Sequence, residues 1–555
     1  MTNSLGRAAG VLVIACLVSA TTAAQAAQVS PTHTSDARAT ATRTHRDPSE
    51  LAAIGANHEL EHRHAEVEGR ASAGKILPAP QLAVSSATPD VIGSWSAPRT
   101  NGSNVVGIHS VLLKTGKVLQ WSAKPVLQSD GTYETYTFAI VWDPTTQTSR
   151  RVDLPDDGNV FCGASTILGD GTVAVVGGVD PYYANSSSGI PVVLLFDPMS
   201  ETWTWAPSMR KGRWYPTITK AADGSAIIVG GRDAAKKPNF DVERITSDPN
   251  VAPTLIGQYN LDWQQGLYPN QFLMPDGRIF TYAGSRTDYL DLTNWTATVA
   301  PGPKPLAPQF DYPNAVVLSL TPGGPIDMVV YGGKNKFAGT NTTLSSRLRL
   351  GVSGQRFQAQ TPMPQPRANM NSILLPDGKI LVVGGNGQGN FNVPYLQSLM
   401  YDPTTDTWTP LASQQKRRGY HSTAMLLPNG KVLSSGDNGA GGGLTFNEIY
   451  SPPYLFRGTR PVITAFPTTT TVGTNIDVTT NVAVTTLVLM APMSTTHATD
   501  MNQRRVVLRT SPLSSGGPGR SALIPNDGTV PPGPYMLFAL NANGVPSVAR
   551  WVQVN

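Results

Sequence analysis

An internal repeat in the middle of the chain restricts the fold more than any other feature of the sequence. Each unit is an apolar strand, a turn that ends in glycine, and a second apolar strand that is often closed by Gly-Gly. Asp-Gly and Asn-Gly turns supply the positive φ angles of a tight hairpin, and paired glycines let neighbouring backbones approach closely. The seven units have turn glycines 47 to 55 residues apart: Gly116, Gly171, Gly224, Gly277, Gly324, Gly378 and Gly430.

This spacing is typical of one four-stranded sheet per unit. The pattern resembles kelch repeats, and seven of them imply a seven-bladed β-propeller over residues 91–458. After the last unit, residues 459–555 are rich in Thr, Val and Pro and carry short alternating strands. They predict an immunoglobulin-like β-sandwich. The fold class is therefore expected to be all-β. The 53 Gly and 46 Pro residues agree with this, because they indicate a chain rich in turns.

The N-terminus predicts export. Residues 1–27 have the features of a signal peptide: Arg7, a short apolar run, and a small-residue cleavage site near Ala26/Ala27. The apolar run is too short to span a bilayer. We therefore expect a secreted protein without a membrane segment. Its mature form would begin with a disordered and partly helical extension over residues 28–90.

The extension contains His58-Glu59-Leu60-Glu61-His62, which matches the H-E-x-x-H pattern of zinc peptidases. On a helix this spacing places two imidazoles on one face with a carboxylate beside them. The surrounding residues are charged or alanine and offer little apolar surface to shape a site. We interpret the segment as a solvated helix or linker, so a metallopeptidase is the least favoured function.

Charge excludes another class of partner. The net charge of +5 is small for 555 residues, and no dense Lys/Arg patch with interleaved aromatic residues is present, so nucleic acid is not an expected partner. We expect a monomer that acts on a small molecule.

Chemically capable residues recur at one position of the repeat, nine residues before the turn glycine. Equivalent positions of successive blades lie on one ring around a propeller axis. Gly107, Ala315 and Asn369 occupy the ring position in units one, five and six. In the other four units it holds Cys162, Tyr215, Tyr268 and His421, with Tyr420 just before the last. We therefore expect a thiol, phenols and an imidazole to converge at one face of the central channel.

Residue counts favour a metal site there. Removal of the signal peptide leaves Cys162 as the one cysteine, which cannot form an internal disulfide. A buried structural thiol is the plainer interpretation, and a reactive or modified thiol is the alternative. The predicted globular part contains three histidines, His109, His421 and His497. Imidazole and phenolate donors suit copper(II) in a tetragonal arrangement.

Four separated motifs carry a family resemblance. They are Phe161-Cys162, Arg213-Trp214-Tyr215, Gly419-Tyr420-His421-Ser422, and Thr496-His497 followed by Asn502-Gln503-Arg504-Arg505. Together and in this order they resemble the copper radical oxidases, the galactose oxidase and glyoxal oxidase family, from about residue 91 to the C-terminus.

The resemblance implies a site and a reaction. Cys162 and Tyr215 would be joined by a thioether that carries a radical. Tyr215, Tyr420, His421 and His497 would bind one copper ion, and Tyr420 would also be the catalytic base. The enzyme would oxidise a small, glyoxal-like aldehyde or a primary alcohol with O2 and produce hydrogen peroxide.

Departures from the galactose oxidase pattern refine this expectation. The segment after the third Gly-Gly lacks the tryptophan that covers the linked tyrosine in galactose oxidase, so either another aromatic residue, such as Trp214 or Trp263, replaces it or the radical is less shielded. The N-terminal sugar-binding domain of galactose oxidase also has no counterpart, which favours the glyoxal oxidase side of the family. Tyr268 either lines the pocket or packs in the core, and we interpret His109 as structural. The alternative function is a non-catalytic kelch propeller that binds carbohydrate or protein.

Overall fold

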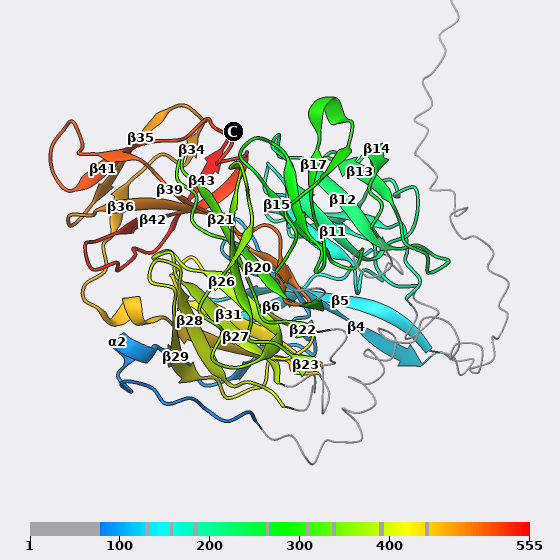
Figure 1. Ribbon diagram of the computed structural model, residues 1–555, viewed down its shortest axis with the longest axis horizontal. Helices are drawn as coiled ribbons and strands as arrows, with labels where there is room; N and C mark the ends of the chain where they lie inside the picture. Colours follow the sequence, from blue (N-terminus) through cyan, green and yellow to red (C-terminus); the bar gives the residue numbers. More distant parts are fainter. Residues whose placement is uncertain are drawn as a thin grey trace, which may run out of the picture. The chain divides into compact units, whose positions relative to one another are not determined.

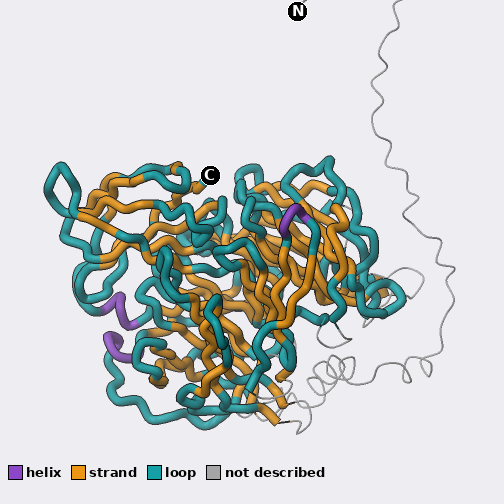
Figure 2. Tube along the Cα trace, turned by 45° about the horizontal axis from the view of Figure 1, so that its top comes forward, coloured by secondary structure: helices purple, strands orange, loops and turns teal. Residues whose placement is uncertain are grey.

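The computed structural model describes residues 78–127, 133–155, 159–180, 187–261, 266–306, 310–311, 313–335, 340–387, 393–438 and 443–555 (Figure 1). The predicted signal peptide, the H-E-x-x-H segment and Trp263 lie outside the described residues. Strands and connecting loops make up nearly all of the described chain (Figure 2). None of its helices combines the length and the apolarity that a membrane span requires.

Seven antiparallel sheets follow the seven sequence units. Blade 1 contains β3 (His109–Leu112), β4 (Val118–Leu127), β5 (Tyr133–Asp143) and β6 (Thr148–Arg151). Blade 2 contains β7 (Ala164–Ile167), β8 (Val173–Val176), β9 (Val193–Asp197) and β10 (Thr202–Trp205). Blade 3 contains β11 (Trp214–Lys220), β12 (Ala226–Arg232), β13 (Asp241–Ile245) and β14 (Thr254–Gln258). Blade 4 contains β15 (Asn270–Leu273), β16 (Ile279–Tyr282), β17 (Thr287–Asp291) and β18 (Thr298–Pro301).

The last three blades complete the propeller. Blade 5 contains β20 (Asn314–Val317), β21 (Ile326–Tyr331), β24 (Ser345–Leu350) and β25 (Phe357–Ala359), and β19 (Phe310–Asp311), β22 (Lys334–Asn335) and β23 (Thr340–Asn341) form a separate small sheet. Blade 6 contains β26 (Arg367–Leu374), β27 (Ile380–Gly387), β28 (Gln397–Asp402) and β29 (Thr407–Ser413). Blade 7 contains β30 (Ser422–Leu426), β31 (Val432–Gly436) and β32 (Phe446–Ser451), and takes its outer strand from β1 (Ser94–Trp95) and β2 (Arg99–Thr100). The chain thus closes the ring by pairing its first strands with its last blade.

The turn glycines behave as the repeat predicts in six of the seven units, with φ between 77° and 93°. The fifth unit differs, because its left-handed glycine is Gly323 (φ 64°) and its hairpin is longer. The bond from Leu318 N to Asp327 O encloses eight residues, whereas the bond from Leu375 N to Lys379 O in blade 6 encloses three.

The longer hairpin makes the assignment of Ala315 to the ring wrong. Asn314 begins β20 as Asn270 begins β15, and both line one small cavity with Asn371 of β26. The ring position lies two residues before these asparagines. Ala315 lies one residue after Asn314 and is therefore not at the ring position.

Paired glycines join successive blades, as their sequence pattern predicts. The second glycine donates its N–H to a carbonyl that precedes the next inner strand or, in one case, begins it. These bonds are Gly178 N to Arg213 O, Gly231 N to Gly266 O, Gly333 N to Arg367 O and Gly385 N to Arg418 O, at 2.6 to 2.9 Å. A Cβ on the first glycine of each pair would lie 2.1 to 2.7 Å from the same carbonyl. No other residue fits there without moving the next blade.

The C-terminal domain is a β-sandwich of two sheets (orange to red in Figure 1). One contains β33 (Ile463–Ala465), β35 (Asn475–Thr480), β41 (Gly519–Leu523) and β40 (Thr510–Ser511). The other contains β34 (Thr469–Thr470), β43 (Arg550–Val554), β42 (Gly533–Leu540), β36 (Thr486–Met490) and β39 (Arg505–Val507). Apolar side chains of both sheets, such as Val478 and Leu537, share one core. The all-β propeller and immunoglobulin-like sandwich are confirmed.

A hairpin carries the C-terminal domain into the propeller. It consists of β37 (Ser494–Thr496) and β38 (Thr499–Asp500), and β37 pairs antiparallel with β3, so that Thr496 lies opposite His109. Blade 1 thereby becomes part of a six-stranded sheet. The remaining short helices are α2 (Pro89–Ile92), η2 (Thr293–Trp295) and η3 (Pro453–Phe456).

Candidate metal centre

Two phenols and two imidazoles meet where the hairpin reaches the channel. The hydroxyl groups of Tyr215 and Tyr420 share a hydrogen bond. The Tyr420 ring stacks on His421 with centroids 3.9 Å apart, and the rings of His421 and His497 are 4.3 Å apart at 84°. The Tyr215 and His497 centroids are 4.7 Å apart. These four side chains and Cys162 are at most 4% exposed. The structure therefore brings all five predicted site residues together.

The ring residues share an uncommon backbone conformation. Five of them have φ between 45° and 65°: Cys162, Tyr215, Tyr268, Asn369 and His421. Side chains normally alternate between the two faces of a strand, and the left-handed residue interrupts this alternation near the start of these five inner strands. As a result adjacent side chains point the same way, and Tyr420 stacks on His421 as Trp214 stacks on Tyr215. Such conformations cost about 1–3 kcal/mol each and persist only where surrounding contacts impose them.

Backbone contacts impose this conformation. Tyr215 N donates to Cys162 O at 3.0 Å, and Tyr268 N donates to Tyr215 O at 2.9 Å, so three successive blades are joined at the ring itself. Buried arginines lie just before the site: Arg213 donates to Gly230 O and Arg418 to Gly436 O.

Each of these arginines also has a buried carboxylate partner. Arg213 pairs with Glu243 at 2.7 Å and Arg418 with Glu448 at 3.1 Å. Loss of one member would leave the other charge buried and unpaired. Each pair therefore fixes the start of a strand that supplies a site residue.

Hydrogen bonds orient both imidazoles. His421 Nδ1 lies 2.6 Å from Asn438 Oδ1, and His497 Nδ1 lies 2.7 Å from Thr496 Oγ1. A metal would therefore bind through Nε2 of each ring, since the partner of one ring nitrogen decides which nitrogen is available. Sequence reasoning missed Asn438, which lies eight residues after the turn glycine Gly430 and therefore away from the ring position on which the candidates were sought.

The electrostatics of the cluster favour a cation. Burial is the main cause that raises the pKa of Tyr215 well above its usual value, and the neighbouring Tyr420, Cys162 and Tyr268 raise it further. Tyr215 is thus a neutral phenol in this setting, and a bound divalent cation would favour its phenolate form. No three His, Cys, Asp or Glu side chains cluster within the described ranges, so a metal here needs the phenol oxygens. Two imidazole nitrogens and two phenol oxygens fit copper(II).

Trp214 covers the Tyr215 ring. Their centroids are 3.7 Å apart and the planes 7° from parallel. The guanidinium carbon of Arg232 lies 5.0 Å from the Trp214 ring centre. Of the two tryptophans expected to replace the missing one, Trp214 is therefore stacked on Tyr215, from the preceding position in the chain.

Two further residues line the cluster. The Tyr268 ring lies 4.4 Å from Tyr215 and 4.8 Å from His497, and its hydroxyl donates to Gly163 O at 2.7 Å. His109 stacks on Trp121 at 4.7 Å and meets the edge of His497 at 5.6 Å. Burial lowers the pKa of His109 to about 3, so this imidazole is neutral. His109 thus packs against a candidate ligand, a contact that its place in the sequence did not reveal.

Comparisons with known proteins agree with this geometry. The family model described as glyoxal oxidase N-terminus matches residues 105–452, and the model described as galactose oxidase-like, early set domain matches residues 460–554. A galactose oxidase of Gibberella zeae is 29% identical over 506 residues, which cover 83% of this chain and 71% of that protein. An aldehyde oxidase of Arabidopsis thaliana is 30% identical over 394 residues, which cover 62% and 63%.

The fold is also that of a solved structure. A fungal alcohol oxidase in complex with copper superposes with a TM-score of 0.71 at 24% identity, over 84% of this chain and 100% of that chain. The first family model alone spans well over half of the present sequence. The chain therefore belongs to the glyoxal oxidase and galactose oxidase family of copper-dependent oxidases.

Proposed function

We propose that this protein is a secreted copper radical oxidase that converts a small aldehyde or a primary alcohol with O2 and releases hydrogen peroxide. The observation that carries the proposal is the buried cluster of Tyr215, Tyr420, His421 and His497 beside Cys162. The four side chains come from blades 3 and 7 and the C-terminal hairpin, and Cys162 comes from blade 2. Burying polar groups is costly. Apolar side chains would fill the same space at lower cost, so packing alone does not explain why these four polar side chains converge.

The four side chains would hold one copper ion through Nε2 of His421 and His497 and the hydroxyl oxygens of Tyr215 and Tyr420. When bound, copper supplies a one-electron acceptor and a positive charge that polarises the substrate oxygen. Asn438 and Thr496 hold the two imidazoles in the orientation that binding needs. Two phenolates would balance the charge of the cation in this buried setting.

Cys162 would form a thioether with the Tyr215 ring. The thiol loses its S–H hydrogen, the ring loses a C–H hydrogen, a C–S bond forms, and O2 takes up both hydrogens as hydrogen peroxide. The linked ring can then lose one electron and become the second one-electron acceptor. Trp214 stacked on Tyr215 excludes water from this face.

Tyr420 is placed to act as the base. As a phenolate it accepts the hydroxyl proton of an alcohol or of a hydrated aldehyde, and the oxidised Tyr215 oxygen beside it takes a hydrogen atom from the carbon. The alcohol becomes an aldehyde and the hydrated aldehyde becomes an acid, while O2 becomes hydrogen peroxide. The match of residues 105–452 to a glyoxal oxidase model supports a small aldehyde as substrate.

Mass spectrometry and a peroxide assay test the proposal. After aerobic copper loading, the denatured protein should be two hydrogens lighter than the copper-free protein, and the Cys162 and Tyr215 peptides should remain joined. Cys162→Ser should show neither change. The loaded protein should release peroxide with glyoxal-like aldehydes or small primary alcohols. Separate peptides and no peroxide with any of these substrates would leave the alternative, a non-catalytic kelch propeller that binds carbohydrate or protein.

A further inference from the structure

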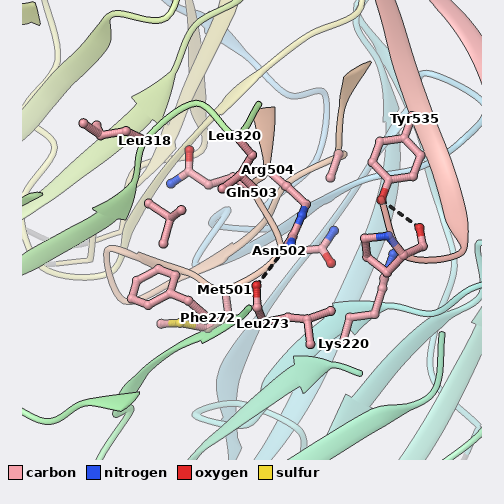
Figure 3. Close-up of a pocket in the computed structure, with 13 residues that line it drawn as sticks. Lys220, Phe272, Leu273, Leu318, Leu320, Met501, Asn502, Gln503, Arg504 and Tyr535 are labelled. Carbon is pink, nitrogen blue, oxygen red and sulfur yellow. Dashed lines mark hydrogen bonds between the residues drawn. The ribbon is translucent and has the colours of Figure 1, made fainter. Parts of the chain in front are cut away.

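A small cavity lies between the propeller and the C-terminal domain, away from the metal centre. Its volume is about 30 Å³. One wall comes from the ends of β11, β15 and β20, with Lys220 and Leu273 at the last positions of their strands. The other wall is the segment from Met501 to Arg504, which follows the hairpin that carries His497. Figure 3 shows Lys220 approaching from the propeller, and Asn502 and Arg504 from the C-terminal domain.

Lys220 brings a positive charge to this cavity. Its side chain is buried, at 6% exposure for the residue. Lys220 lines the cavity, and its ammonium can donate three hydrogen bonds. The pKa of Lys220 is lowered to about 7, mainly by burial and in smaller part by the nearby Arg504 charge, while Asp170 opposes the shift.

Arg504 brings a second positive charge. Its Nε donates to Thr529 O at 2.7 Å and its Nη1 to Leu273 O at 3.0 Å. These two bonds fix the guanidinium plane. Its Nη2 is buried and has no hydrogen-bond partner among the described residues. The N–H groups of Arg504 Nη2 therefore remain available to a ligand.

The carboxylates nearest to these cations bind elsewhere. Asp527 accepts from Gly323 N at 2.8 Å and from both the amide and the hydroxyl of Thr529. Asp170 accepts from Thr172 N at 2.9 Å. Within the described ranges neither carboxylate forms an ion pair with Lys220 or Arg504. The described lining of the cavity therefore contains two basic side chains and no carboxylate, and one of them, Arg504, has a buried Nη2 without a partner.

We propose that this cavity binds a small monovalent anion, a halide or the head of a short carboxylate, between Lys220 Nζ and Arg504 Nη2. A water molecule needs about 10–15 Å³ of such volume, so the cavity has room for about two water-sized atoms, which suits a small anion better than sulfate or phosphate. The Tyr535 hydroxyl does not compete for Lys220 or Arg504, because it donates to Pro531 O at 2.8 Å. The bound anion joins blade 3 to the segment behind His497 and stabilises the docking of the C-terminal domain.

Anomalous diffraction locates the anion directly. Crystals of the full-length protein grown in sodium bromide should show a bromide peak between Lys220 Nζ and the Arg504 guanidinium. The peak should be absent from Lys220→Met, which keeps the length of the side chain and removes its charge. A wild-type map with bromide only on the outer surface overturns the proposal.

Thermal unfolding at constant ionic strength distinguishes a halide site from one that also accepts carboxylates. Chloride, formate or methanesulfonate is varied to 200 mM, the last being too large for the cavity. The wild-type Tm should be roughly 2–4 °C higher in chloride than in methanesulfonate, because an anion that binds the folded state stabilises it by mass action. Formate should give the same rise if the site also accepts carboxylates. A rise with chloride alone assigns a halide site, and a rise with both extends it to carboxylates. Lys220→Met should show no difference among the anions, and the exposed-site control Lys304→Met should behave as wild type. Equal shifts in wild type and Lys220→Met, or none in either, overturn the proposal.

Discussion

At the scale of single residues, the left-handed backbone of the ring positions determines the composition of the site. The turn at His421 allows Tyr420 and His421 to face the same space, so one strand supplies two of the four candidate ligands. The turn at Tyr215 likewise lets Trp214 cover the phenol that would carry the radical. A regular strand would direct one residue of each pair away from the channel.

Tyr420→Phe tests the role of the second phenol. The substitution removes one hydroxyl and retains the ring that stacks on His421. We expect the protein to bind copper and to form the Cys162–Tyr215 link, because the other donors remain. Turnover should fall by about 10²- to 10⁴-fold, the usual contribution of a positioned base. Peroxide release measures turnover, and peptide mapping with copper analysis provides the controls. Near-normal peroxide release would contradict the role assigned to Tyr420.

His109 predicts an acid-sensitive fold. Its pKa is about 3 in the folded protein and about 6.5 in an unfolded chain. The unfolded state therefore binds the proton first as the pH falls, and the free energy of unfolding decreases from pH 6.5 towards pH 3. His109→Phe retains a ring to stack on Trp121 but cannot titrate. Between pH 6.5 and 4.5 the wild type should lose about 2 kcal/mol more than the variant.

Urea unfolding of both proteins at several pH values measures this difference. Because the comparison concerns the change with pH, a constant packing cost in His109→Phe does not affect it. Parallel stability curves for the two proteins would show that His109 does not contribute to acid sensitivity.

At the scale of elements, glycine pairs and buried arginines set the distance between blades. Gly384 is the sharpest case, since a Cβ there would lie 2.1 Å from the Arg418 carbonyl, two residues before Tyr420. Gly354 also has a positive φ (68°) but has no atom within 4 Å of an added Cβ. The two positions thus share the backbone requirement and differ in the packing requirement.

Gly384→Ala and Gly354→Ala form a matched pair. Gly354→Ala should cost only the backbone term, about 1–2 kcal/mol. Gly384→Ala should cost several kcal/mol more, because it forces blades 6 and 7 apart, and it should also weaken copper binding through Tyr420 and His421. Denaturant unfolding and a competitive copper titration measure both quantities. Equal losses of stability in the two variants would refute the argument that close blade contact needs glycine at position 384.

Much of this arrangement follows from periodicity in the sequence. Seven turn glycines predicted seven blades, and the ring rule brought Cys162, Tyr215 and His421 together because equivalent blade positions share a radius. The rule failed at Ala315, where a longer hairpin shifts the register. His497 is outside the repeat, so the ring rule did not indicate it; the count of histidines in the globular part and the family resemblance did. Asn438 and the contact of His109 with His497 depend on side-chain packing between distant segments, which periodicity does not encode.

At the scale of the whole molecule, the propeller and the C-terminal sandwich share a core. Val488, Met490 and Phe538 of the sandwich pack in one apolar cluster with Leu426 and Leu433 of blade 7. The hairpin that carries His497 adds a strand to blade 1. A copper ion held by Tyr215, Tyr420, His421 and His497 would therefore join both parts, and neither part contains the site alone.

Calorimetry of the full-length protein tests this coupling. With a shared core, the propeller and the sandwich should unfold in a single transition rather than in two. Copper binds the folded state, so it should move that entire transition to higher temperature. His497→Ala should retain the single transition of the metal-free protein and lose most of the copper-induced shift, because the sandwich no longer contributes a ligand. Two resolved transitions, of which copper moves only one, would mean that the metal centre belongs to one part, and that the hairpin docks on blade 1 without binding the ion.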